Sequence, residues 1–570
     1  MKYILLISVV LTGFLMVSCG EKELDVNSLV AVGGKKYGGE FKFMSSEKIN
    51  SLIPTSVSDH YSSRVVSQLF DPLLHLNTST MQVAPAVAES FRVNDDATVY
   101  TFKIRKNVFF HKDECFEGEP HELNAYDAKF TLDLACSGLE INNIDHLLVN
   151  RIKGAKAFNK ATRKTFNPKG VSGITVLDKY TLQVQLNSPF SGFENIITNP
   201  SLGIFPKEAY MKYGKELYKH AVGSGPFALE SITEDKITLK RNNNYWKKDA
   251  FGNQLPFMSK VIVTYTNDKR SELLAFREAS VDLVLEIPVE EIEHTLGTLI
   301  EAQEGKNIIH KVRYEPSLSM TYIAMACESA EFSNADVRKA FNLAINREGI
   351  VETKLEGEGW VAMNGFVPSM YNYPNEKVIG HKYDVAQARA LMAKSGYANG
   401  DNFPALDFYV NAVEGSNAHK LCQVISEQLK TNLNVTLNIK LCSISERQAA
   451  IVSGKAKIWR SGWIADYPDP ENFLSLFYGG NITNSGSVNF FKFHSEEYDV
   501  LFERAVSESN LEQRTNLLVK CDQMIVDQAA LMPILTDDHI VMVNARVRGF
   551  KANSMESLNI TEVFIKEPRR

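Results

Sequence analysis

Long apolar runs are almost absent from this sequence of 570 residues. The one exception is Tyr3 to Val17, and it is shorter than the roughly 20 apolar residues that span a bilayer. No segment of comparable apolarity follows, so no membrane-spanning helix is expected. Cysteine is also scarce: seven residues, whose spacing does not resemble a zinc site.

Motifs that would indicate a familiar enzyme are missing too. The chain contains no G-x-S-x-G elbow, no H-E-x-x-H, no G-x-x-x-x-G-K-[ST] loop and no G-x-G-x-x-G turn. The net charge of -6 is spread along the chain, which gives no reason to expect nucleic acid as a partner. These absences favour a binding protein over an enzyme, and no cofactor is expected.

The N-terminus has the features of an export signal. Lys2 precedes the apolar run, which ends at Val17-Ser18-Cys19, and a small residue followed by Cys at this point resembles the bacterial lipobox. We therefore expect residues 1–18 to be a signal peptide and 19–39 a tether. Cys19 would then be lipidated and anchor the exported protein to a membrane of the cell envelope or periplasm. An ordinary signal peptide with an incidental cysteine is the alternative.

Two kinds of hydrophobic periodicity indicate a mixed α/β fold. Strands of period two recur, for example around Tyr100 to Ile104 and Ile237 to Arg241. Later, strand-like Leu406 to Val410, helix-like Asn417 to Leu433 and strand-like Val435 to Leu441 follow one another. That order predicts a βαβ unit with parallel strands, and such folds place ligands in clefts between lobes.

The segment from His111 to His121 is rich in metal-ligating residue types. It contains two His, Cys115 and several carboxylates, a donor set that suits a transition metal. The spacing is irregular, however, and the segment reads as a loop that contains Gly and Pro. A solvated acidic loop is therefore the favoured interpretation, and no metal site is predicted.

An aromatic segment, Ile458 to Pro470, gives a sharper signal. It holds two of the four Trp residues, together with a Tyr, an Arg and an Asp. Aromatic rings bury large surfaces, and Arg and Asp can bind opposite charges, so the group would suit a zwitterion with apolar side chains. The alternative is that the rings are core and that Arg460 and Asp466 pair locally.

Several motifs in consistent order resemble one family, the extracellular solute-binding proteins of family 5, which are peptide-binding lipoproteins of ABC importers. They span about residues 40–550. The motifs are Leu69-Phe-Asp-Pro-Leu-Leu74, Ala88-Glu-Ser-Phe91, Tyr100-Thr-Phe-Lys-Ile-Arg105, Gly223-Ser-Gly-Pro-Phe227, Leu239-Lys-Arg-Asn-Asn-Asn-Tyr-Trp246, Asp336-Val-Arg-Lys-Ala340 to Ala344-Ile-Asn-Arg347, and Gly462-Trp-Ile-Ala-Asp-Tyr-Pro-Asp-Pro470. The chain departs from the family in the longer Phe110 to Phe116 loop.

The resemblance implies a periplasmic-binding-protein-like α/β fold of type II, cluster C, with two main lobes around a hinge and an inserted third domain. The implied domain I is discontinuous and joins residues 40–70, 195–312 and 530–570. The implied domain II is an insertion over 71–194, and domain III covers 313–529. The ligand would be enclosed by hinge closure.

The resemblance also implies the binding residues. Asp466 would pair with the α-amino group of a peptide, and Arg460 with the carboxylate of peptides of certain lengths. Trp463 and Tyr467 would line the cleft. The remaining implied ligand-binding positions are Gly462, Ser58 and His60, the last two in a segment that would offer backbone to an extended peptide.

Export makes disulfides feasible, and two pairs are candidates. In a βαβ unit Cys422, early in the helix, and Cys442, at the end of the next strand, lie toward the same edge of the sheet. Cys115 and Cys136 would connect the inserted loop to the next helix.

We therefore expect a monomeric lipoprotein that captures peptides for the permease subunits of an ABC transporter. A binder of another solute with the same fold, such as a metal chelate, haem or an oligosaccharide, is the alternative. A peptidase or metal-dependent hydrolase is less favoured, since no positioned nucleophile or base is evident.

Overall fold

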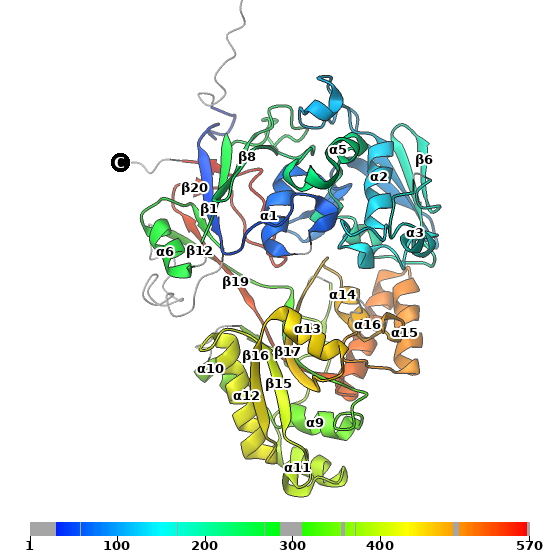
Figure 1. Ribbon diagram of the computed structural model, residues 1–570, viewed down its shortest axis with the longest axis vertical. Helices are drawn as coiled ribbons and strands as arrows, with labels where there is room; N and C mark the ends of the chain where they lie inside the picture. The colour runs from blue at the N-terminus through cyan, green and yellow to red at the C-terminus, as the bar shows by residue number, and fades with distance from the viewer. Residues whose placement is uncertain are drawn as a thin grey trace, which may run out of the picture.

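The computed structural model describes residues 30–57, 59–167, 169–266, 268–285, 310–354, 359–370, 372–482 and 489–566. This part of the chain is mixed α/β, as expected, with two larger sheets in the upper half of Figure 1 and one in the lower half. A core cluster runs through the upper half, and two separate clusters lie on either side of the lower sheet.

The first sheet gathers strands from distant parts of the sequence. Strand β1 buries Phe41 and Phe43 on one face and runs parallel to β10 and β11, whereas the other pairs are antiparallel. Its described strands, in spatial order, are β12 (His310–Pro316), β19 (Asp538–Asn544), β11 (Leu283–Val284), β1 (Glu40–Ser45), β10 (Lys260–Tyr265), β9 (Lys236–Arg241) and β8 (Phe227–Ile232).

The segment between β1 and β8 forms the rest of the upper half. Tyr100, Phe102 and Ile104 are buried along β5, which confirms the alternation expected there. Its strands are β2 (Leu74–Asn77) paired with β3 (Gln82–Pro85), and the antiparallel sheet β4 (Ala88–Val93), β5 (Val99–Ile104), β7 (Thr181–Gln185) and β6 (Ile174–Asp178). Its helices are α1 (His60–Leu69), α2 (Ala125–Ala135), α3 (Ala155–Ala161), α4 (Phe193–Ile196) and α5 (Lys207–Tyr213).

The lower sheet contains the predicted βαβ unit. Strands β15 and β16 are parallel and are joined by α12, so the prediction is confirmed. The described strands, in spatial order, are β14 (Trp360–Val361), β18 (Leu531–Thr536), β13 (Ser319–Met325), β17 (Ile458–Ile464), β15 (Leu406–Asn411) and β16 (Leu437–Cys442).

Helices cover both faces of this sheet. Asn334 caps α9, and the face of this helix that carries Val337, Ala340 and Phe341 is buried, as their spacing predicts. On that face lie α9 (Ala335–Leu343), α10 (Arg347–Lys354), α11 (Val385–Lys394) and α12 (Asn417–Leu433). The opposite face packs against α13 (Ile444–Val452), α14 (Pro470–Leu474), α15 (Glu496–Ser507) and α16 (Leu511–Asp527).

Two strand-to-strand connections join the upper and lower halves. Strand β12 continues into β13 through Ser317 and Leu318, and β18 continues into β19 through Asp537. The two connections are hydrogen-bonded to each other, since the Ser317 amide donates to the Asp537 carbonyl (3.0 Å). These short antiparallel crossings are visible beside the β19 label in Figure 1, and we expect the hinge of the fold at this place. The boundaries of domains I, II and III stay a prediction.

Residues 30–39, which were expected to be part of a tether, pack against the upper half of the molecule. Lys35 forms an ion pair with buried Asp249 (2.8 Å), and the Val32 amide donates to Asn253 (2.9 Å). The sequence does not predict these contacts, because the segment is polar and each contact is made with a residue more than 200 positions away. The strands β20 (Val547–Arg548) and β21 (Phe564–Ile565) and helix α6 (Lys269–Arg277) complete the described strands and α-helices.

Candidate ligand-binding cleft

A cleft of about 1570 Å³, including space open to solvent, lies between the upper half and the end of β17. Its walls are mostly apolar, with charged groups of both signs among the apolar side chains, which suits a zwitterionic ligand that carries apolar groups. It is lined by residues of α1, the chain into β2, the segments 144–147, 198–201, 245–247 and 464–468, and the C-terminal segment 555–561.

Asp466, just past the end of β17, lines this cleft. Buried Asn472 on α14 fixes its backbone, because its Oδ1 accepts from the Asp466 amide (3.1 Å) and from Trp463 Nε1 (2.9 Å). On the other side Asn199 donates to the Asp466 carbonyl (3.1 Å). The carboxylate is left 32% exposed, so a rigid backbone presents a partly open anion to the cleft.

His146 faces Asp466 from the opposite wall. Its Nε2 lies 3.7 Å from Asp466 Oδ2, too far for a good hydrogen bond, and its side chain is 40% exposed. Burial lowers the pKa of His146, but the Asp466 carboxylate outweighs that effect and the pKa is raised. The imidazolium therefore serves as a loose counter-ion to Asp466 when no other cation is present.

Two aromatic side chains place a second carboxyl group in the wall. Asp71 accepts from Trp246 Nε1 (2.8 Å) and from Tyr245 (3.1 Å). Burial raises the pKa of Asp71 to about 6 despite these bonds. Beside it, burial and the Lys247 charge lower the pKa of His75 to about 4, so its imidazole is neutral.

Of the other residues predicted to bind ligand, His60 lines the cleft at the start of α1, and Ser58 lies outside the described residues. Trp463 supports the site instead of lining it, through its bond to Asn472. Arg460 and Gly462 lie further along β17; the Arg460 charge acts on Asp537 beside the hinge, and Gly462 pairs with Thr321.

Tyr467 does not line the cleft, contrary to expectation. It is 2% exposed, donates to Glu471 (2.5 Å) and accepts from Arg151 (3.2 Å). Its neighbours Asp466 and Pro468 line the cleft, so the extended turn directs the residue between them into the core.

The predicted disulfides are absent, since the six described cysteines are free thiols. Cys422 packs between α12 and the lower sheet, whereas Cys442 packs on the opposite face because side chains along β16 alternate. Cys136 caps the C-terminal end of α2. Cys115 lies near its other end, next to Phe116, which stacks on His121.

Sequence reasoning missed His146, Asn472 and Asn199. Single polar residues without a periodic or motif context give no signal, and the first and last lie more than 250 positions from Asp466. Tyr245, Trp246 and Asp71 do belong to motifs noted above, but their mutual contact could not be seen from spacing.

The family model for bacterial extracellular solute-binding proteins, family 5, matches residues 82–485. The chain belongs to this family. It is 26% identical over 492 residues to heme-binding protein A of Haemophilus influenzae, covering 85% of this chain and 84% of the relative. It is 25% identical over 498 residues to a dipeptide-binding protein of Pseudomonas aeruginosa, covering 85% and 86%.

The fold is that of the periplasmic binding proteins, as predicted. The structure of DppA from Helicobacter pylori in complex with peptide STSA matches with a TM-score of 0.74 at 23% identity, over 93% of this chain and 99% of that one. Family and fold are those of solute-binding proteins and indicate no class of enzyme. Among the described residues, no helix has the length and apolarity needed to cross a membrane. Cys19 lies outside the described residues.

Proposed function

We propose that this family 5 protein captures peptides with a free N-terminus and delivers them to the permease of an ABC importer. The observation that carries the proposal is the partly exposed carboxylate of Asp466 in the cleft, on a backbone fixed from both sides. Its only ion pair within the described residues is the long one to His146. An ammonium group is a better partner, because it can donate short charge-assisted hydrogen bonds to the same oxygens.

The rest of the cleft fits the remainder of a peptide. Lys247 lines the wall beside neutral His75 and supplies positive charge for a carboxylate. Arg460 lies on the strand that leads to Asp466 and would meet the carboxylate of other peptide lengths once the lobes close. Recognition of charged ends and backbone leaves the side chains free to vary, which favours broad specificity.

The decisive experiment compares a free and an N-acetylated version of one peptide by calorimetry. The peptide is first identified by native mass spectrometry of protein purified from its own host. Asp466→Asn removes one partner of a pair that closure desolvates, at a cost of roughly 3–5 kcal/mol, so affinity should fall about 100-fold or more. N-acetylation should have a similar effect on the wild type.

Asp407→Asn is the matched control, because Asp407 is a partly exposed carboxylate on β15 that pairs only loosely with Lys440 (3.8 Å). It should bind both peptides as the wild type does. Equal affinity of the wild type and Asp466→Asn for both peptides would remove Asp466 from the site.

A second candidate ligand is haem, favoured by one observation. His60, His75 and His146 all line the cleft, and imidazole is a common ligand of haem iron. The relative from Haemophilus influenzae carries that ligand in its name. Titration with haemin should then give a shifted haem absorption band that is lost in the triple His→Ala variant. An unchanged spectrum leaves the peptide as the ligand.

We further propose that Cys19 is the lipidated first residue of the mature protein, held at the membrane of an exporting bacterium. Cys19→Ala should release the protein from the membrane fraction or leave it unprocessed. Acylated, membrane-bound Cys19→Ala protein would contradict the anchor while leaving the binding function untouched.

A further inference from the structure

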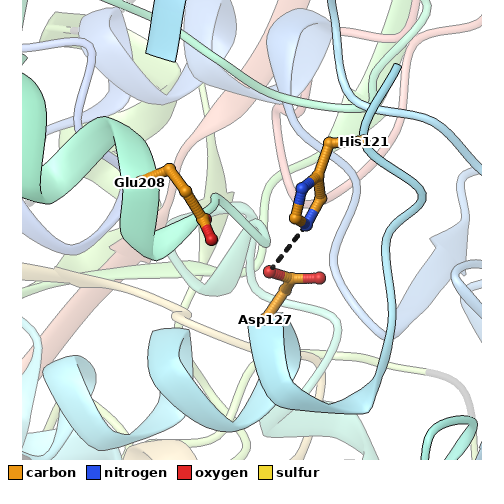
Figure 2. A group of neighbouring side chains, drawn as sticks. All are labelled: His121, Asp127 and Glu208. Carbon is orange, nitrogen blue, oxygen red and sulfur yellow. Dashed lines mark ion pairs between the residues drawn. The ribbon is translucent and has the colours of Figure 1, made fainter. Parts of the chain in front are cut away.

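Away from the cleft, three metal-ligating side chains converge in the inserted part of the upper half (Figure 2). His121 lies in the loop before α2, Asp127 in the first turn of α2, and Glu208 in the first turn of α5. One ligand atom from each lies within 4.8 Å of the others. None of the three lines the cleft, and only His121 belongs to the loop whose composition suggested a metal.

The imidazole of His121 is held in place by two aromatic rings. Phe116 stacks on it with the ring centres 4.8 Å apart, and Phe110 packs at 5.7 Å. Its Nε2 is buried and forms no close hydrogen bond, and its one recorded contact with a charged group is a long ion pair of 3.6 Å to Asp127 (Figure 2). A buried ring nitrogen whose only partner is this distant is incompletely satisfied, and a ligand placed between the two groups would satisfy both.

Asp127 offers one oxygen to this nitrogen. Its Oδ2 accepts from the Asn124 amide (2.9 Å) in the capping box that starts α2. Its Oδ1 lies 3.6 Å from His121 Nε2, too far for a hydrogen bond. The separation is close to the ~3.4 Å between two ligands that are each about 2.1 Å from a tetrahedral zinc ion.

Glu208 supplies the third group. Its side chain is exposed and forms no ion pair within the described residues, so it is free to turn toward the other two. Two nearby lysines are already engaged, because Lys179 pairs with Glu122 (3.0 Å) and Lys212 with Glu114 (3.5 Å). Among the described residues, the carboxylates of Asp127 and Glu208 therefore form no ion pair with a Lys or Arg.

We propose that His121, Asp127 and Glu208 bind one divalent transition-metal ion of the zinc class, with water in the remaining position. One imidazole and two carboxylates are a donor set for such an ion. The ion would cross-link the loop before α2 to α2 and α5. It would fix the inserted region, where the chain departs from the family, without taking part in ligand capture.

The test uses full-length protein treated with chelator and titrated with Zn²⁺ alone in a calorimeter. The wild type should bind one ion per chain. His121→Ala and Glu208→Gln should each weaken binding by more than about 100-fold, since changes outside the ligand shell alone cost about 10–100-fold. Glu208 is exposed, so Glu208→Gln keeps the fold and secures the test if His121→Ala does not fold.

Matched controls are His494→Ala and Glu216→Gln, which remove an exposed His and an exposed Glu elsewhere; both should bind as the wild type does. Cys115→Ser should also bind normally, and Co²⁺ substituted for Zn²⁺ should show visible bands without a thiolate charge-transfer band. No binding by the wild type, unchanged binding by Glu208→Gln, or a thiolate band would overturn the site. Peptide affinity should be the same with and without the ion, which keeps this test separate from the proposed function.

Discussion

At the scale of single residues, the proposed binding of an ammonium group implies competition for one carboxylate. Asp466 is paired loosely with His146 across the cleft, and both side chains are partly exposed. A ligand ammonium has to displace the imidazolium or sit beside it. Two positive charges at one carboxylate repel, so the protonation state of His146 should tune peptide affinity.

This competition predicts a pH dependence. The pKa of His146 is raised above its usual value of about 6.5. The imidazole is therefore protonated at low pH and loses its charge as the pH rises through the raised pKa. Peptide affinity should rise several-fold over that interval, until the ligand ammonium itself deprotonates near about pH 8. Calorimetry at a series of pH values should show the rise in the wild type and a smaller rise in His146→Gln, where Asp71, with its pKa of about 6, still titrates in the cleft.

The same titration acts on stability with the opposite sign. A raised pKa in the folded state means that the His146 contribution is full below the unfolded pKa of about 6.5 and disappears as pH rises through the folded value. Because the pair is half-exposed, this contribution should be small. A rise in affinity that is undiminished in His146→Gln would assign the titration to another group.

At the scale of elements, the junction between β17 and α14 positions the site. Asn472 is 3% exposed and accepts hydrogen bonds from both the Trp463 indole and the Asp466 amide. One side chain on a short helix thus ties the end of the strand to the turn that carries the carboxylate. Arg151 and Glu471 (2.8 Å) anchor the same helix to the upper half.

We expect Asn472→Ala to weaken peptide binding about tenfold or more. The substitution leaves two donors without an acceptor, at roughly 1–3 kcal/mol each, and frees the backbone of Asp466. Calorimetry and urea denaturation, read together, separate lost affinity from lost stability. Asn411→Ala on β15 is the control, because the Asn411 side chain donates a long hydrogen bond to the Cys442 carbonyl (3.3 Å) and lies outside the cleft. Full affinity in Asn472→Ala would show that the turn holds its shape without this residue.

At the scale of the whole molecule, the described part of the chain passes between the two halves twice, at Ser317–Leu318 and at Asp537. The cleft takes its walls from the upper half and its Asp466 from the lower half. Ligand that bridges both walls favours the closed arrangement by its differential affinity for the two states.

Peptide binding should therefore make the molecule more compact. Small-angle scattering should show a smaller radius of gyration at saturating peptide. The N-acetylated peptide at the same concentration should leave the radius unchanged, because it lacks the group that reaches Asp466. An identical radius with and without bound peptide would show that capture needs no closure.

The sequence by itself determined the local structure and the family. Period-two alternation identified β5, the strand–helix–strand order identified β15, α12 and β16, and the motif around Asp466 marked a segment that lines the cleft. These inferences hold because they depend on neighbours along the chain, where spacing decides which side chains share a face.

Only the tertiary structure decided which distant groups meet. It turned Tyr467 into the core, separated Cys422 from Cys442 on opposite faces, docked residues 30–39, and placed His146 against Asp466. It also brought Glu208 to His121 and Asp127, which no spacing in the sequence suggests. The physical reason is that each of these contacts depends on how lobes and faces are oriented, and that orientation follows from packing of the whole chain rather than from any local pattern.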